Sequence, residues 1–247
     1  MEPLYVFLHI PKTGGTTIRD NVEANLGDKS YLMLRTSRRL FSKKQVFEFL
    51  ENLSQEEKDN IKFIGGHFVY YNLKKFFPDR EIRYVTFFRE PVSRMISFFN
   101  QAFQLYLENR KGPWTQIFFD NSKKDFSNWL SPNNFLSRTY LSFLASRLLN
   151  KENLDVEADF EKIKDILKKF YFLGFTENEE DFDKLYRLIG IKKLITHSNV
   201  SKEFIDLKGS RFLKSESSED INKILLEKCP LDFNLYEFVK QLNTNLK

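Results

Sequence analysis

LYVFLHIPKTGGTT, residues 4–17, combines three local signals in one short stretch. Its first half is apolar and rich in β-branched and aromatic residues, which is typical of a buried strand. A lysine, two glycines and three threonines follow in the second half, and a helical pattern begins at residue 16. Glycines let backbone N–H groups approach an anion, and a helix start supplies unpaired N–H donors at the positive end of its dipole. We therefore predict an anion-binding loop to which Lys12 adds a full charge.

The order of residues in this loop differs from that of the common ATP-binding loop, GxxxxGK[ST]. Here the lysine precedes the glycines instead of following them. This order disfavours a purine triphosphatase. An ordinary turn between strand and helix, with Thr16 as the N-cap, is the structural alternative, but it leaves the lysine and the paired glycines unexplained.

A second strand-loop-helix unit is predicted at residues 83–97, RYVTFFREPVSRMIS. Its apolar run ends at Arg89, and Pro91 suits the first turn of the helix that follows. Ser97 lies roughly two helical turns further on and could meet Arg89 if the chain reverses between them. A guanidinium fork and a hydroxyl suit a phosphate monoester. A salt-bridged arginine and a solvated serine are the alternative.

Short apolar runs alternate with longer helical patterns along the chain, which predicts an α/β fold with a mostly parallel central sheet between helices and a helical C-terminal part. The predicted strands are residues 5–10, 63–64, 83–88 and 171–175. The predicted helices are residues 16–26, 42–53, 91–109, 134–149, 157–169, 178–189, 217–229 and 231–243. Residues 109–132 are interpreted as an insertion over one face. No linker or repeat divides the chain, so residues 1–247 are predicted to form one domain.

Composition excludes several classes of protein. With 41% hydrophobic and 30% charged residues in 247, the chain is globular rather than disordered. A single cysteine, Cys229, disfavours a disulfide-stapled fold and a structural zinc site. No apolar run approaches the roughly 18 residues of a membrane span, and no signal peptide is recognised, so we expect a soluble, cytoplasmic protein without a membrane anchor. The net charge, 39 − 34 = +5, favours anionic ligands but does not by itself predict nucleic-acid binding.

Glycine is scarce, at 9 of 247 residues, yet four of the nine form the pairs Gly14-Gly15 and Gly65-Gly66. His67 follows the second pair at the end of a predicted strand, where α/β folds bind ligands. Neutral imidazole accepts a proton readily near pH 7, so we predict His67 as a general base. His9 is expected to be a core histidine within the first strand, whereas His197 borders a polar loop.

Together the two strand-loop-helix units resemble the sulfotransferases that use 3′-phosphoadenosine 5′-phosphosulfate (PAPS). The Pro-Lys-Thr-Gly-Gly-Thr-Thr form is most similar to the glycan O-sulfotransferase branch, which includes the heparan sulfate 2-O and 6-O enzymes. The resemblance implies a P-loop-like, three-layer fold in which the first loop binds the 5′-phosphosulfate and the second binds the 3′-phosphate. The implied donor contacts are Lys12, Thr13, Gly14, Gly15, Thr16, Thr17, Arg89, Ser97 and Ser201. Weaker similarities extend over most of the chain, at residues 65–67, 134 and 138, 172–177, 199–201 and 231–236.

The implied reaction is an in-line transfer of a sulfuryl group to a hydroxyl, with His67 as the base and Lys12 assisting the leaving group. Because the transferred group carries less charge than a phosphoryl group, a lysine can suffice without a metal ion. A carboxylate base is the alternative, since some members of the family use one. The chain departs from the Golgi members by lacking a membrane anchor and disulfides, which favours a soluble bacterial or cytoplasmic relative.

The sequence contains few signals for the acceptor, which is predicted to be a hydroxyl on a glycan or a small molecule. A basic cluster suits an anionic glycan but is equally typical of a solvated helix face; it comprises Arg35, Arg38, Arg39, Lys43 and Lys44. Four aromatic residues could stack on a sugar or pack in a core, namely Tyr70, Tyr71, Trp114 and Trp129. Two other functions are open: a P-loop-like nucleotide kinase or hydrolase, and a non-catalytic module that binds anions or nucleic acid. Oligomeric state is not encoded in any recognisable pattern.

Overall fold

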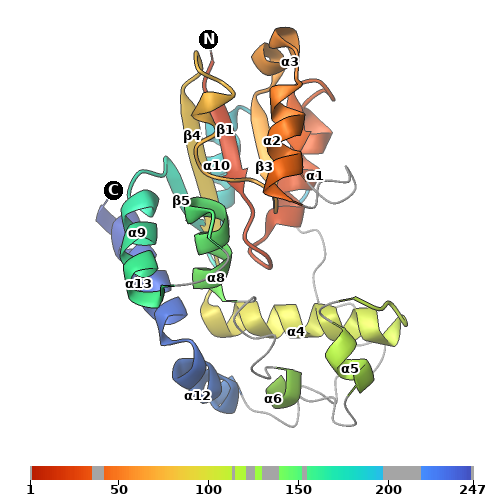
Figure 1. The fold of residues 1–247 in the computed structure, drawn as a ribbon, viewed down its shortest axis with the longest axis vertical. Coiled ribbons are helices and arrows are strands. Elements are labelled where there is room, and N and C mark those ends of the chain that lie inside the picture. Colours follow the sequence, from red (N-terminus) through yellow and green to blue (C-terminus); the bar gives the residue numbers. More distant parts are fainter. Residues whose placement is uncertain are drawn as a thin grey trace.

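Five parallel strands form the centre of the molecule in a computed structural model that describes residues 2–34, 42–112, 115–120, 126–129, 139–151, 155–196 and 218–245 (Figure 1). The strands lie side by side in the order β2-β3-β1-β4-β5. They are β1 (Leu4–Leu8), β2 (Tyr31–Met33), β3 (Phe63–Gly66), β4 (Ile82–Phe88) and β5 (Phe172–Phe175). This parallel sheet, flanked by helices, confirms the predicted α/β fold.

β1 lies where the direction of the strand connections reverses. The chain leaves β1 for β2 and β3 on one side and then crosses to β4 on the other. In the register of the sheet, Leu8 of β1 pairs with Gly66 of β3 and with Thr86 of β4. The carboxyl ends of the three central strands therefore meet at one edge, which is where open α/β sheets bind their ligands.

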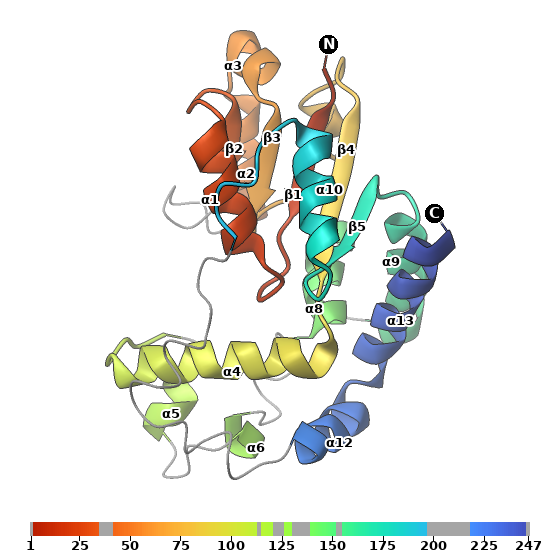
Figure 2. The same cartoon turned by 180° about the vertical axis from the view of Figure 1, so that it is seen from behind.

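Helices cover both faces of the sheet because the side chains of β1 alternate between two hydrophobic cores. Tyr5 and Phe7 pack with residues of α1 (Gly15–Asn25) and α10 (Glu179–Ile189), which Figure 2 shows on one face. Leu4, Val6 and Leu8 belong to the core on the other face. The helices that pack there are α2 (Lys43–Glu51), α8 (Tyr140–Leu144), α9 (Val156–Leu167) and α13 (Pro230–Asn245).

A third core lies beyond the carboxyl edge of the sheet. The long helix α4 (Pro91–Leu107) crosses below that edge in Figure 1. It packs against α6 (Phe126–Trp129) and α12 (Ser218–Lys228), and α5 (Gln116–Asp120) adjoins it. Trp129 is fully buried among phenylalanines of α4, so it packs in a core and offers no ring to an acceptor. α4 thus forms a floor opposite the ends of the strands.

Most predicted elements occur within two residues of their expected bounds, and the differences are local. β1 ends at Leu8 instead of Ile10, so His9 follows the strand and does not belong to it. Three elements lie in stretches where none was predicted: β2, the short helix α3 (Gln55–Asn60) and the 3₁₀ turn Leu73–Lys75. The predicted insertion contains α5 and α6. The helix predicted at 134–149 is described from residue 139, as α8 followed by the single π-helical turn Ala145–Leu149.

No helix in the described ranges is both long enough and apolar enough to cross a bilayer.

Candidate active site

The loop after β1 presents backbone N–H groups at the start of α1. Lys12 (φ 70°) and Gly14 (φ 75°) both adopt the left-handed conformation, which folds the chain tightly between strand and helix. The buried hydroxyl of Thr13 donates to the carbonyl of Ile10 at 2.9 Å. Gly14 is the N-cap of α1 and has no side chain that could accept from the first-turn N–H groups. These donors are arranged as in an anion-binding helix terminus. Thr16 lies inside α1, so the structural alternative of an ordinary turn with Thr16 as the N-cap does not apply.

Both glycine pairs are required by close contacts at this edge of the sheet. A Cβ at Gly15 would lie 2.0 Å from Nε2 of His9, so the imidazole of His9 rests directly on the backbone of the loop. Gly66 has a φ of +132°, and a Cβ there would lie 2.2 Å from the carbonyl oxygen of Leu34. The two glycine pairs lie where the ends of β1 and β3 are close together, and His9 and His67 are in contact at the same place.

His9 joins the site instead of lying in a strand as predicted. Its ring stacks on that of His67, with 4.0 Å between the centroids, and on that of Phe7 at 5.5 Å. Burial holds the pKa of His9 well below its usual value, and the nearby positive charges of Arg19 and Lys12 act in the same direction. His9 is therefore a neutral spacer between the anion-binding loop and His67.

His67 is held in one orientation by the backbone of the neighbouring strand end. Its Nδ1 lies 2.9 Å from the carbonyl oxygen of His9, and a carbonyl can only accept, so Nδ1 carries the hydrogen and Nε2 carries the lone pair. Burial lowers the pKa of His67, the charges of Arg147 and Lys12 lower it further, and the bond to His9 opposes them. The half-buried imidazole is thus neutral at pH 7, with a basic nitrogen at Nε2.

Arg147, from the π-helical turn, forms hydrogen bonds with the backbone of His67 and of Tyr71 shortly after it. Its Nε donates to the carbonyl of His67 at 2.6 Å, and its own carbonyl accepts from the N–H of Tyr71 at 2.9 Å. Its guanidinium also donates to the hydroxyl of Tyr70 at 3.1 Å and lies over that ring, 4.8 Å from the centroid. The sequence pattern does not single out this arginine, because Arg147 falls inside a regular helical pattern. A π-helical turn has no sequence signature that would have singled it out.

Lys12 and Arg89 place two positive charges at the same edge. The ammonium of Lys12 is 3.5 Å from Oε1 of Gln101 on α4. Burial, together with the charge of Arg89, lowers the pKa of Lys12 to about 8. Within the described part of the chain, neither side chain forms an ion pair with a carboxylate. Two crowded cations of this kind favour a bound anion.

The other predicted donor contacts are placed with varying completeness. Thr16 and Thr17 lie in the first turn of α1, with Thr17 the more buried. Ser97 lies on α4 and is largely buried, and Arg89 directly follows β4. Their convergence on one phosphate stays a prediction. Several predicted residues lie outside the described ranges, namely Arg35, Arg38, Arg39, Trp114, Asn134, Arg138, His197 and Ser201.

The remaining basic and aromatic candidates are largely engaged in local contacts. Lys44 pairs with Glu48 at 3.7 Å, and Lys43 lies 5.0 Å from the centroid of the Phe47 ring, as expected for a solvated helix face. Tyr70 is buried.

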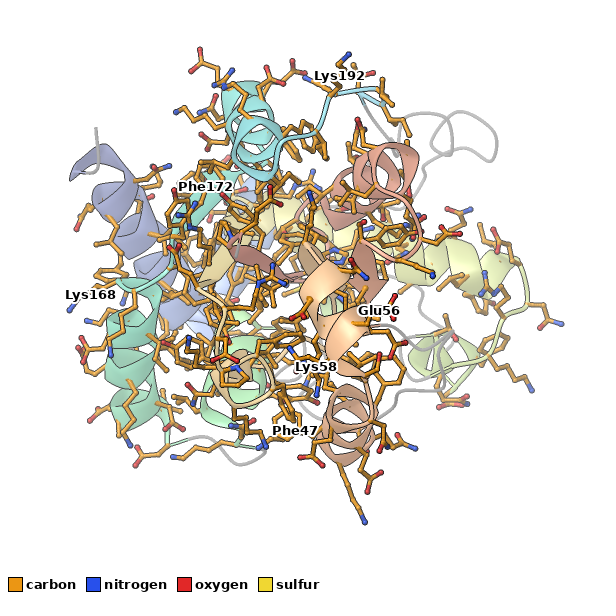
Figure 3. All side chains as sticks on the ribbon, turned by 90° about the horizontal axis from the view of Figure 1, so that it is seen from above. Phe47, Glu56, Lys58, Lys168, Phe172 and Lys192 are labelled. Atoms are coloured by element: carbon orange, nitrogen blue, oxygen red, sulfur yellow. The ribbon has the colours of Figure 1, made fainter. Side chains whose placement is uncertain are left out.

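Three lysines outside the predicted cluster are dispersed. Figure 3 shows Lys58, Lys168 and Lys192 on different sides of the molecule, so these three lysines do not form one patch.

Comparison with known proteins agrees with this geometry. A family model described as "Sulfotransferase family" matches residues 4–239, a span that includes both predicted loops, both glycine pairs and α13 as far as Val239. The curated proteins contain no match to the chain.

Replacing Arg147 with glutamine is expected to raise the pKa of His67, because it removes a positive charge that disfavours the imidazolium ion. The other groups that face this ring, His9 and Lys12, are unchanged. An NMR titration of the imidazole nitrogens measures the pKa and also reports the Nδ1–H form. The matched control is Arg83→Gln, since Arg83 pairs with Glu81 near the opposite end of β4. A pKa for His67 that stays equal or falls in Arg147→Gln would contradict the placement of the guanidinium.

Proposed function

Because the chain belongs to the sulfotransferase family, we propose that it is a PAPS-dependent O-sulfotransferase that acts as a single domain over residues 1–247. One observation carries the proposal. Lys12 and Arg89, two cations without a carboxylate partner among the described residues, adjoin a glycine-capped helix start, and the neutral His67 stands beside the same loop. An anionic donor and a deprotonated base are the two requirements of sulfuryl transfer to a hydroxyl.

The residues of the first loop fit the phosphosulfate end of the donor. The N–H groups at the start of α1 are free of any cap from the side chain at position 14, and Lys12 contributes a charge beside them. PAPS, when bound, supplies an activated sulfuryl group whose transfer leaves 3′-phosphoadenosine 5′-phosphate (PAP). With a pKa near 8, Lys12 is mostly protonated at pH 7 and can stabilise the negative charge that develops on the leaving phosphate oxygen. Arg89 and Ser97 would hold the 3′-phosphate.

His67 is proposed to take the proton from the acceptor hydroxyl at Nε2. The contact between Nδ1–H and the His9 carbonyl holds the ring in place and stabilises the imidazolium that forms. The same contact fixes which nitrogen is basic, much as an acceptor fixes the histidine of a hydrolase triad. A base of this kind contributes roughly 10²- to 10⁴-fold to the rate.

The acceptor is proposed to be a hydroxyl on a glycan or a small molecule, and the similarity of the first loop to glycan O-sulfotransferases supports a glycan, including an anionic one. A P-loop-like kinase or hydrolase is not favoured, because Lys12 precedes the glycines of the loop.

Calorimetric titration with PAP and with ATP tests the donor. The protein is expected to bind PAP at least about tenfold more tightly than ATP without magnesium, because ATP lacks the 3′-phosphate that an arginine fork would hold. Arg89→Ala is expected to remove most of that preference. Tighter binding of ATP, with activity that depends on magnesium, would instead establish the kinase or hydrolase.

Transfer activity tests the two proposed catalytic residues. His67→Ala and Lys12→Ala are each expected to lower kcat by about 10²-fold or more, because the first removes the base and the second the charge on the leaving oxygen. Transfer of labelled sulfate from PAPS to a panel of hydroxyl compounds provides the assay, and circular dichroism verifies the fold. Wild-type turnover in His67→Ala would rule out this histidine as the base and leave a carboxylate.

The pH dependence of PAP affinity tests the position of Lys12. The free protein loses the Lys12 proton above a pH of about 8, whereas a bound phosphate favours the charged form. Binding should then take up a proton, and affinity should fall as the pH rises above 8. Calorimetry in two buffers of different ionisation enthalpy counts the proton. Lys12→Met should abolish the uptake, and Arg89→Ala should move its onset to higher pH; uptake that persists in Lys12→Met would exclude this assignment.

A further inference from the structure

We propose that Tyr140 and Glu177 are positioning residues for the donor, because they hold the backbone on both sides of the peptide bond that joins Arg89 to Glu90. The hydroxyl of Tyr140 donates to the carbonyl of Arg89 at 2.5 Å and accepts from the N–H of Arg89 at 2.9 Å. Oε1 of Glu177 accepts from the N–H of Glu90 at 2.7 Å. The inference rests on the proposed function, in which Arg89 binds the 3′-phosphate.

Tyr140 is itself fixed by two other helices. It is fully buried, and its backbone N–H donates to Oδ2 of Asp232, on α13, at 2.8 Å. Arg94 of α4 lies 4.0 Å from the centroid of the Tyr140 ring and 3.4 Å from Oδ2 of Asp232. Burial raises the pKa of Tyr140, so its hydroxyl keeps the hydrogen that it donates to Arg89. The hydroxyl of Tyr140 is therefore held in a fixed position, and its two hydrogen bonds fix the backbone of Arg89 in turn.

Glu177 reaches the same turn from the end of β5. The N–H of Thr176 donates to the carbonyl of Phe88 at 2.9 Å, which ties residue 177 to the end of β4. Glu90 then caps α4 with its own side chain, accepting from the N–H groups of Val92 and Ser93 at 2.8 and 2.7 Å. The turn from β4 to α4 is thus held by α8, by β5 and by its own cap.

The backbone of Arg89 matters because a long side chain transmits any rotation at its Cα to its guanidinium. Misplacement of a binding group by about 1 Å can cost up to about 10²-fold in a reaction. Nothing on the side chain of Tyr140 or Glu177 needs to touch the donor for this effect. Both residues act through the position of Arg89.

Tyr140→Phe removes only the hydroxyl and is expected to weaken PAP binding about tenfold, an intermediate effect for a displaced arginine. The matched control is Tyr84→Phe. Tyr84 is also a buried tyrosine, and its hydroxyl accepts a backbone N–H, that of Leu73, at 2.8 Å. It lies on β4 roughly 17 Å along the strand from Arg89. Both variants should unfold at a lower temperature than the wild type, but only Tyr140→Phe should lose PAP affinity in calorimetric titration.

Glu177 supplies a second test that does not depend on a buried residue, because its side chain is exposed. Glu177→Gln keeps an acceptor oxygen and removes the charge, whereas Glu177→Ala removes both. We expect Glu177→Ala to bind PAP several-fold more weakly than Glu177→Gln, and this pair decides the matter if Tyr140→Phe does not fold. Wild-type PAP affinity in Tyr140→Phe, or equal affinity in the two Glu177 variants, would overturn the positioning role alone. Failure of the wild-type protein to bind PAP would overturn the proposed function itself.

Discussion

The contact between His67 and the carbonyl of His9 is the interaction on which the arrangement of this site depends. It exists only because β1 and β3 are parallel neighbours in a register that pairs Leu8 with Gly66. The two strands therefore end side by side, and the residues that follow them are in contact. The contact also needs two places without a Cβ. Gly15 makes room for the ring of His9, and Gly66 allows the turn that directs the next residue toward it. The scarcity of glycine elsewhere in the chain fits this, since the pairs stand where contacts are closest.

Positive charge dominates the site, and it acts in two directions. Lys12 and Arg89 favour a bound anion, whereas Lys12 and Arg147 make it harder to protonate His67, and Lys12 and Arg19 do the same for His9. An anion bound beside Lys12 would offset part of this repulsion and make His67 more basic. Binding of the proposed donor and activation of the proposed base would then be linked through electrostatics, with no movement of either residue.

The sequence was sufficient for the fold class, for most of the strands and helices and for the position of one glycine pair after β1 and the other at the end of β3, because hydrophobic period and glycine pairs are local signals. What it did not reveal depends on contacts between distant segments. β2 is three residues long and fits no clear period, and Arg147 lies in a helical pattern that becomes a π-helical turn. The prediction that His9 lies within the first strand was wrong, because the neighbouring strands determine where a strand ends, and β3 ends beside Leu8. Tyr140 and Asp232 are 92 positions apart, a separation that no local pattern can bridge.

Through the buried pair of Arg94 and Asp232, helix α13 helps to hold the turn at Arg89, which lies more than a hundred positions earlier in the sequence. Asp232 comes from the last helix, and through Tyr140 it supports a turn that is made long before that helix during synthesis. A chain still emerging from the ribosome can pair its central strands and form the loop at Lys12 without α13. It cannot complete the surroundings of Arg89 until α13 has folded back onto α4 and α8. Completion of the proposed donor site therefore requires α13 to be docked, and during synthesis it would follow the pairing of the central strands.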